Sequence, residues 1–164
     1  MERHAEIVMA PNKPDQGHQK TSIFLAGTTT NTGGPDWRET LTRALIHYPV
    51  TIFNPNRPDW DRTWKEDFSD KRWEEQVWWE LDMQEAASII VFMFHRSTDA
   101  PISLMEFGLA VKTKLKRVFV CAQEGYRKKG NVEAVCKRFG AKLVHTEEEL
   151  QDALFTALHI GNFQ

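Results

Sequence analysis

Five short apolar runs alternate with helical segments along this chain, and this alternation constrains the fold more than any other feature. The runs cover residues 22–27, 50–54, 88–94, 117–122 and 141–146. Helical segments begin at Asp36 and cover about 70–86, 101–114, 131–139 and 147–159. Strands that alternate with helices predict right-handed βαβ units, and apolar runs without polar alternation are typical of parallel strands covered on both faces. We therefore expect a five-stranded parallel sheet in an α/β sandwich.

The length of 164 residues predicts one domain over residues 21–164, preceded by a flexible tail over residues 1–20, which is polar and has no periodicity. The net charge of -2 offers no basic surface for a nucleic acid polymer or a membrane. The N-terminal segment lacks an apolar signal, and the longest apolar run, residues 89–94, is too short to span a bilayer. We expect a cytoplasmic protein, with no metal because its cysteines and histidines are scattered.

The loops that follow the first three expected strands are the places to look for a binding site. In open parallel sheets, ligands bind beyond the carboxyl ends of the strands, where strand order reverses. The loops cover residues 27–36, 54–65 and 95–103. Their polar and small residues are candidates for substrate binding, although ordinary turn chemistry explains them equally well. These candidates are Gly27, Thr28, Thr29, Asn54, Asn56, Arg57 and Ser103.

Glu106 lies in the first turn or two of the helix that follows the third expected strand, in the segment PISLMEFG. A carboxylate there is held ionised by the helix dipole and free backbone N–H groups, as nucleophilic attack on an anomeric carbon requires. The spacing of Ser103 and Glu106 also matches a capping box, in which both residues only stabilise the start of the helix. Spacing alone favours the capping interpretation.

Glu80 and Asp82 lie on the long helix before the third expected strand. They are two residues apart and point to different sides of the helix. Glu80 borders a stripe formed by Trp73, Val77, Leu81 and Gln84. Carboxylates beside such a stripe usually sit at its solvated edge. The alternative is a carboxyl group with a raised pKa that protonates a leaving base, and the height of Glu80 along the helix favours it over Asp82.

Five tryptophans fall within twenty residues: Trp60, Trp64, Trp73, Trp78 and Trp79. For each one a place in the core is the simpler interpretation. As a group they predict an aromatic wall beside a pocket for a planar base, with Trp79 as the candidate contact.

The order of several motifs resembles the nucleoside 2-deoxyribosyltransferase-like family. The motifs are IFLAG in the first strand, DWR in the first helix, FNPNR after the second strand, WWEL in the long helix and PISLMEFG after the third strand. The resemblance covers about residues 22–121. It implies a flavodoxin-like (Rossmann-like) three-layer sandwich and a small-molecule substrate: a nucleoside, nucleotide or nucleobase.

The same resemblance implies roles for four acidic residues. Glu106 matches the nucleophile that forms a covalent glycosyl-enzyme at C1′, and Glu80 matches the acid that protonates or positions the base. Asp82 and Asp99 are further candidates, although the spacing of Asp99 departs from the pattern. A tyrosine that orients the nucleophile in the family has no counterpart here, because Phe24 and Leu25 occupy that region.

The expected activity is therefore transfer of a 2-deoxyribosyl group between nucleobases by two carboxyl groups about 5 Å apart, without a cofactor. A nucleoside or nucleotide N-glycoside hydrolase of the same superfamily is the first alternative, and a non-catalytic nucleotide-binding module is the second. The resemblance and the tryptophan-rich segment both predict a homodimer or larger homo-oligomer.

Overall fold

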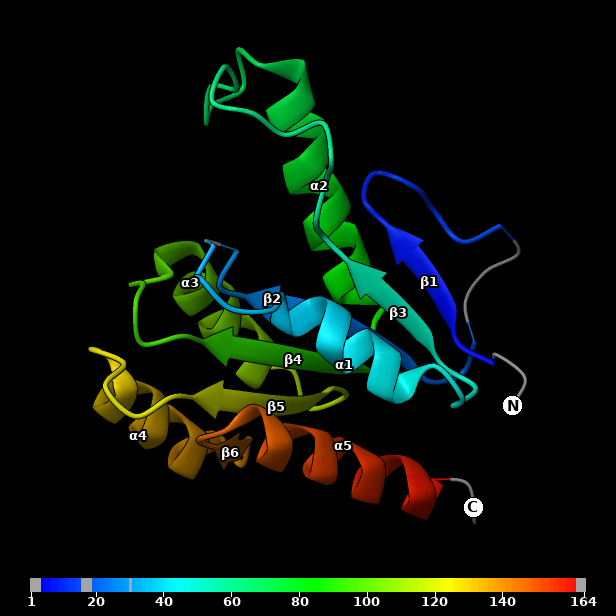
Figure 1. Ribbon diagram of the computed structural model, residues 1–164, viewed down its shortest axis with the longest axis vertical. Helices are drawn as coiled ribbons and strands as arrows, with labels where there is room; N and C mark the ends of the chain where they lie inside the picture. The colour runs from blue at the N-terminus through cyan, green and yellow to red at the C-terminus, as the bar shows by residue number, and fades with distance from the viewer. Residues whose placement is uncertain (1–3, 16–18, 30, 162–164) are drawn as a thin grey trace.

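All strands of the described sheet run parallel, in the order β1-β3-β2-β4-β5-β6 (Figure 1). The computed structural model describes residues 4–15, 19–29 and 31–161. The strands are β1 (Glu6–Met9), β2 (Ser22–Gly27), β3 (Thr51–Asn54), β4 (Ile89–Phe94), β5 (Arg117–Ala122) and β6 (Lys142–Val144). This is the α/β Rossmann-like fold that the alternation of strands and helices predicted.

Five helices cover the two faces of the sheet within the described residues. Helices α1 (Trp37–Leu45) and α5 (Glu147–Gly161) lie on one face (Figure 1). Helices α2 (Lys71–Ala86), α3 (Pro101–Val111) and α4 (Lys129–Phe139) lie on the other. The chain thus forms three layers, with the sheet in the middle.

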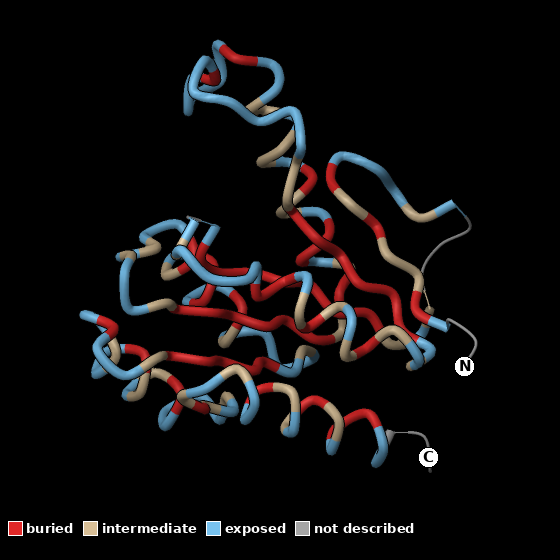
Figure 2. Tube along the Cα trace, viewed as in Figure 1, coloured by how far each residue is buried: buried red, intermediate tan, exposed pale blue. Residues whose placement is uncertain are grey.

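The central strands are buried along their whole length, as the red trace in Figure 2 shows. In β2, Ile23 and Leu25 pack toward α1 and α5, while Phe24 and Ala26 pack toward α2 and α3. Because both faces are covered, neither needs polar side chains, and the strand reads as a continuous apolar run.

Strand β1 was not expected, and it corrects part of the predicted tail. Glu6–Met9 pair in parallel with β3, from Glu6 beside Thr51 to Met9 beside Asn54. The segment EIVM is only four residues long and sits at the sheet edge, where its residues other than Val8 remain partly exposed. Such a strand depends on its partner rather than on its own apolar pattern. The rest of the predicted tail includes residues 1–3 and 16–18, which lie outside the described residues.

Residues 55–78 project from the body of the molecule, and we call them the arm (Figure 1). The arm comprises the loop after β3 and the N-terminal half of α2. None of the described helices is long and apolar enough to cross a membrane.

Candidate functional site

The sheet reverses its strand order at β2, and this reversal defines the candidate site. Strand β2 lies between β3 and β4. The chain therefore passes from β2 through α1 to β3 on one side, and then from β3 through α2 to β4 on the other side. Gly27 ends β2 with φ of 118°, and a Cβ atom there would lie 2.3 Å from the Met93 carbonyl oxygen of β4. Only glycine permits this approach. The Thr28 amide then bonds to Met93, and its hydroxyl accepts a bond from the His95 amide, joining two of the predicted loops.

Glu106 belongs to the second turn of α3 and points into the protein. The helix begins at Pro101, with Ala100 as its N-cap in the left-handed region at φ of 45°. Ser103 is therefore inside the helix, and the capping-box interpretation is wrong: the N-cap carries no side-chain hydrogen bond. Proline at the first helical position has no amide hydrogen that needs a cap. A buried carboxyl without a capping role needs another explanation.

The environment of Glu106 favours its protonated form more than the sequence suggested. The side chain is 7% exposed. Burial, followed by the nearby charge of Glu80, raises the pKa of Glu106 to about 7. We expected the helix dipole to keep this group ionised, but desolvation outweighs the dipole at this buried position. At neutral pH the carboxyl group is poised between its two forms, as a nucleophile or general base can use.

Gln84 holds one oxygen of Glu106. Its side-chain amide donates to Glu106 Oε1 over 2.9 Å, and both residues are buried. This bond lowers the pKa of Glu106 and so partly offsets burial. It also fixes the plane of the carboxyl group, because an amide donor prefers a defined direction to its acceptor.

Arg38 places a buried positive charge beside the two carboxyl groups. Its guanidinium group donates to the carbonyl oxygens of Leu25, Gly27 and Thr28 over 2.8 to 3.0 Å. Burial lowers the pKa of Arg38 to about 10, so the group stays protonated at neutral pH. Its charge in turn lowers the pKa values of both Glu80 and Glu106. Arg38 therefore secures the end of β2 and supplies the counter-charge of the pair.

Glu80 is half-buried on α2, and burial raises its pKa. Gln76 donates its side-chain amide to Glu80 Oε1 over 2.7 Å and to the Pro55 carbonyl over 2.8 Å. Glu80 is thus close enough to Glu106 to affect its titration and is tied to the loop after β3. A pair of coupled carboxyl groups can share one proton, which suits one to act as a nucleophile and the other as an acid.

Asp82 and Asp99 lie at the surface, unlike the buried Glu106. Asp82 is exposed on α2, two residues from both Glu80 and Gln84. Asp99 is exposed and forms a salt bridge with Arg127 over 2.8 Å.

The tryptophans do not form one wall. Trp79 is 3% exposed, packs against Phe24 and donates its indole N–H to the Asn12 carbonyl. Trp64 is buried within the arm, while Trp60 and Trp78 are exposed there. The stripe expected on α2 is confirmed at Gln84 alone, since the buried residues of this helix are Trp79, Met83 and Gln84.

The predicted binding residues divide into two groups. Thr29, Asn54, Asn56 and Arg57 line a cavity of ≈ 730 Å³ beyond the ends of β1 and β3. Gln76, which bonds to both Pro55 and Glu80, lies between this loop and the carboxyl pair. The second group is buried beside the pair or at the end of β2: Gly27, Thr28 and Ser103.

Two of the cavity residues already have partners. Arg57 forms salt bridges with Asp59 and Glu75, and the Asn56 side chain donates to Asp36. A ligand in the cavity would therefore compete with these contacts or use the remaining groups. Among the described residues, no group of three His, Cys, Asp or Glu is arranged to hold a metal ion.

Sequence reasoning missed Gln76, Gln84 and Arg38 as members of the site. The signal for the first two is their spacing, because Gln76, Glu80 and Gln84 follow one another at four-residue intervals and so share one face of α2. Arg38 has a weaker signal, an arginine beside a tryptophan in the first turn of a helix.

The chain belongs to the nucleoside 2-deoxyribosyltransferase-like family. The family model "Nucleoside 2-deoxyribosyltransferase like" matches residues 20–126, well over half of the chain. The match covers β2 to the loop after β5 and includes Arg38, Glu80, Gln84 and Glu106. Family membership supports a function related to nucleoside deoxyribosyl transfer and substrates of the nucleoside type.

A solved structure with a similar fold is described as a conserved protein from Enterococcus faecalis V583. Its TM-score is 0.59 at 14% sequence identity, over 84% of this chain and 99% of that one. At this identity the similarity concerns the fold alone. No curated protein matches the chain.

Proposed function

We propose that the protein transfers a 2-deoxyribosyl group between nucleobases through a covalent glycosyl-enzyme on Glu106. The observation that carries this proposal is the burial of Glu106 without a capping role, with one oxygen held by Gln84 and its titration coupled to Glu80. A buried carboxyl group usually lowers stability, so its presence in this member of the family favours a catalytic use.

In the first step, the free oxygen of ionised Glu106 attacks C1′ of the nucleoside. The bond between C1′ and the base nitrogen breaks, and its electron pair leaves with the base. Protonated Glu80 gives its proton to that base, so the departing group is neutral. Burial raises the pKa values of both carboxyl groups, so the pair retains a proton at higher pH than exposed carboxyl groups do. In the reactive state this shared proton is on Glu80.

In the second step, a nitrogen of another base attacks C1′ and releases Glu106 as a carboxylate. The attacking base loses its proton to Glu80, which restores the starting state. Arg38 balances the negative charge of the pair in both states without contacting the sugar. The reaction needs only these two carboxyl groups.

The test uses a purified deoxynucleoside with and without a second base, followed by chromatography. A new nucleoside that forms only with the second base supports transfer. Free deoxyribose that accumulates equally in both reactions makes the protein a hydrolase instead. If no substrate is consumed from a panel of nucleosides and nucleotides, the binding-module alternative replaces both.

A covalent intermediate can be sought directly by acid quenching and mass spectrometry of peptides. The deoxyribosyl mass should appear on the peptide that contains Glu106 and should be absent from Glu106→Gln. Glu85→Gln is the matched control, since Glu85 is an exposed carboxylate on α2. A labelled peptide from another region would move the nucleophile elsewhere.

We further propose that the chain forms a homodimer or larger homo-oligomer. Helix α3 exposes Ile102, Met105 and Leu109 at 58 to 61%, and the arm exposes Phe68 and Trp78. Exposed apolar groups of this kind are typical of interaction surfaces.

A further inference from the structure

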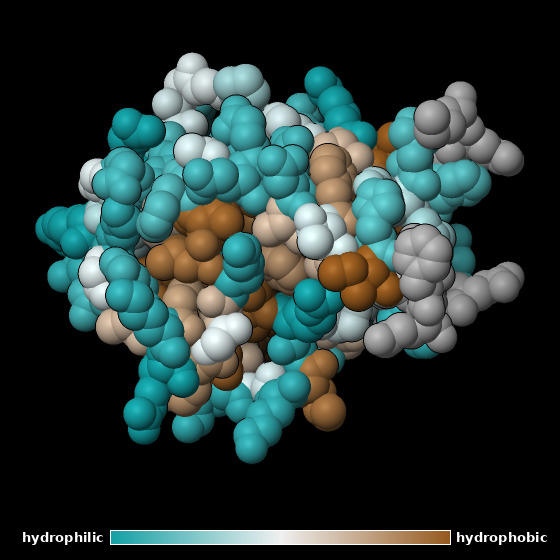
Figure 3. Space-filling view, turned by 90° about the horizontal axis from the view of Figure 1, so that it is seen from below, coloured by the Kyte–Doolittle hydropathy of each residue, from teal (hydrophilic) through white to brown (hydrophobic). Residues whose placement is uncertain are grey.

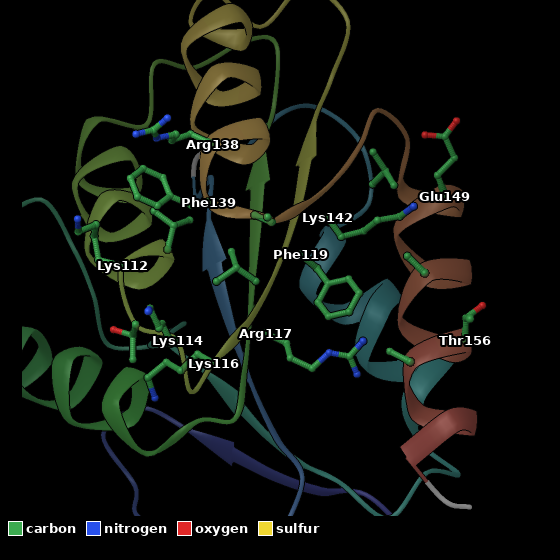
Figure 4. A pocket seen from close by; sticks show the side chains of 18 of the residues that line it. Lys112, Lys114, Lys116, Arg117, Phe119, Arg138, Phe139, Lys142, Glu149 and Thr156 are labelled. Atoms are coloured by element: carbon green, nitrogen blue, oxygen red, sulfur yellow. The ribbon is translucent and has the colours of Figure 1, made fainter.

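A second cavity lies at the opposite end of the sheet from Glu106, at the amino ends of β5 and β6. It has a volume of ≈ 1070 Å³ and is bounded by the turn between α3 and β5, the end of α4, and α5 (Figure 4). Seen from below, the molecule exposes apolar side chains between polar ones on this side (Figure 3). We call this cavity the cationic groove.

Positive side chains outnumber negative ones along the groove, although the net charge of the whole chain is negative. Six of its lining side chains are cationic and two are acidic, Glu149 and Asp152, which gives a difference of +4 in a chain of net charge -2. The cations come from three segments of the chain and are labelled in Figure 4: Lys112, Lys114, Lys116, Arg117, Arg138 and Lys142. Clustered charges above low-dielectric walls attract anions more strongly than scattered ones.

Five of these cations lack a carboxylate partner within the described part of the chain. Lys116 is held by the backbone carbonyls of Glu85 and Ala87 over 2.6 and 2.7 Å, but salt bridges of the described residues involve none of the other five. Surface cations elsewhere do form such pairs, for example Arg127 with Asp99 and Lys71 with Glu74. The groove therefore carries several cations without carboxylate partners, with Lys112 and Arg138 on one side and Arg117 and Lys142 on the other (Figure 4).

Aromatic rings lie directly beneath two of the cations. Lys112 Nζ lies 5.1 Å from the centre of the Phe139 ring, and the Arg117 guanidinium lies 5.5 Å from that of Phe119. Phe139 is 45% exposed, so a flat apolar group can reach it. Alanine and valine residues around the rings complete an apolar floor.

We propose that the cationic groove binds a nucleoside diphosphate or triphosphate. The phosphates would bind among the lysines and arginines, since guanidinium and ammonium groups are the usual ligands of phosphate oxygens. The base would stack on Phe139. A ligand with a single carboxylate would leave most of the cations unpaired, which favours the polyanion.

Helix α3 connects this groove to the carboxyl pair. Val111 and Lys112 line the groove, and Glu106 lies five residues before Val111, or about 7.5 Å along the helix axis. A ligand that shifts the end of α3 would move Glu106 relative to Gln84. The groove would thus regulate the site at the other end of the sheet, and this regulatory consequence, unlike the binding itself, rests on the proposed function.

The binding test uses titration calorimetry on the full chain at about 0.15 M salt, with ATP, GTP, inorganic tripolyphosphate and adenosine as separate ligands. A nucleoside triphosphate should bind saturably and at least about tenfold more tightly than tripolyphosphate or adenosine, because it alone uses both the cations and the rings. Equal binding of tripolyphosphate, or no binding of any nucleotide, would overturn the proposal. Tighter binding of a single-stranded oligonucleotide would also overturn it.

Variants assign the binding to the groove. Arg138→Ala with Lys142→Ala should weaken it by about tenfold or more, whereas Arg43→Ala with Lys65→Ala, an equal loss of exposed charge elsewhere, should leave it unchanged. Circular dichroism confirms that both variants fold. Glu106→Gln should bind normally, and loss of binding in that variant would place the nucleotide at the carboxyl pair instead.

The activity assay separates this proposal from the proposed function. If deoxyribosyl transfer occurs, saturating nucleotide should change its rate in the wild type and not in the Arg138/Lys142 variant. If the chain proves inactive yet binds nucleotide through the groove, the binding proposal stands and the proposed function fails. If the chain is active but the groove variant binds nucleotide as tightly as the wild type does, the proposed function stands and the groove proposal fails.

Discussion

The two halves of helix α2 lie in different environments. The C-terminal half packs against the sheet, buries Trp79 and Met83, and brings Glu80 and Gln84 to Glu106. The N-terminal half projects with the arm, where Trp78 is 50% exposed (Figure 2). One helix therefore contributes one member of the carboxyl pair and also supports a segment surrounded by solvent.

The arm is held by its own ionic and aromatic contacts. The guanidinium groups of Arg57 and Arg72 lie 4.8 and 5.2 Å from the centre of the Trp64 ring. Arg57 also forms salt bridges of 2.7 Å with Asp59 and Glu75. Such partly exposed contacts each stabilise a protein by only about 1 kcal/mol or less. We therefore expect the arm to tolerate changes that the buried half of α2 does not.

The largest expected effect comes from Glu106→Gln. A neutral amide can accept the bond from Gln84 but cannot attack C1′, so transfer should fall by about 10⁴-fold or more. The measurement is the initial rate of nucleoside formation under saturating substrate. A folded variant that retains more than a few per cent of the activity would remove Glu106 from the mechanism.

A matched pair of tryptophans compares the arm, which contains Trp64, with the half of α2 that packs against the sheet, which contains Trp79. Trp79→Ala should lower the free energy of unfolding by about 3–5 kcal/mol, as expected for a large aromatic residue in a core. Trp64→Ala, although Trp64 is also buried, should cost about 1 kcal/mol because the arm can open locally while the core remains folded. Urea denaturation measures both. Equal losses would show that the arm and the core unfold as one unit.

The same Trp64→Ala variant should lose amide-exchange protection in the arm while protection in β2 and β4 stays unchanged. This second measurement distinguishes local opening from general destabilisation.

Stability should depend on pH through Glu106. Its pKa in the folded protein is raised to about 7, so the stability it contributes is present below the ordinary value of 4.5 and is lost as pH rises through 7. Between pH 4.5 and pH 8, the free energy of unfolding of the wild type should therefore fall by up to about 3 kcal/mol relative to that of Glu106→Gln. Denaturation of both proteins across this range measures the difference. A constant difference would contradict the raised pKa.

Gln84→Leu tests whether the buried end of α2 positions the nucleophile. Leucine has a similar volume but no donor, so the rate should fall by about 10- to 100-fold with KM changed less. Because the Gln84 bond lowers the pKa of Glu106, its loss should also shift the acid limb of the rate profile to higher pH. Unchanged pH dependence would mean that Gln84 serves packing alone. Glu85→Gln on the exposed side of the helix is the control.

The sequence predicted the layers and most element boundaries because burial on both faces leaves a strong apolar pattern. Strands β2 and β5 match the expected ranges, and β3, β4 and β6 match with small differences. Strand β1 escaped prediction because an edge strand of four residues takes its stability from β3. Local patterns report burial, whereas pairing at an edge depends on contacts distant in sequence.

The site was predicted less completely, for a related reason. Glu106 and Glu80 were predicted from their positions on two helices and from the family resemblance. The tryptophans that seemed to form one wall instead occupy the core, the arm interior and the surface. Composition cannot tell these places apart, since each depends on how far α2 extends beyond the sheet. Arg38 reaches the pair from the opposite layer, a contact that no spacing within one helix can indicate.

The smallest effect on stability is expected from Phe68→Ser with Trp78→Ser at the surface of the arm. Both rings are at least half exposed, so the unfolding free energy of the monomer should change by about 0.5 kcal/mol or less. Their effect on assembly should be larger, because exposed aromatic residues contribute most to interfaces. Light scattering at micromolar concentration should show the wild type as a dimer or larger and this variant shifted toward the monomer. Leu115→Ser is the control, as Leu115 is 93% exposed in the turn between α3 and β5. A monomeric wild type would contradict the proposed oligomer. If both variants remain oligomeric, the interface lies away from the arm, and the exposed residues Ile102, Met105 and Leu109 of α3 become the surface to test.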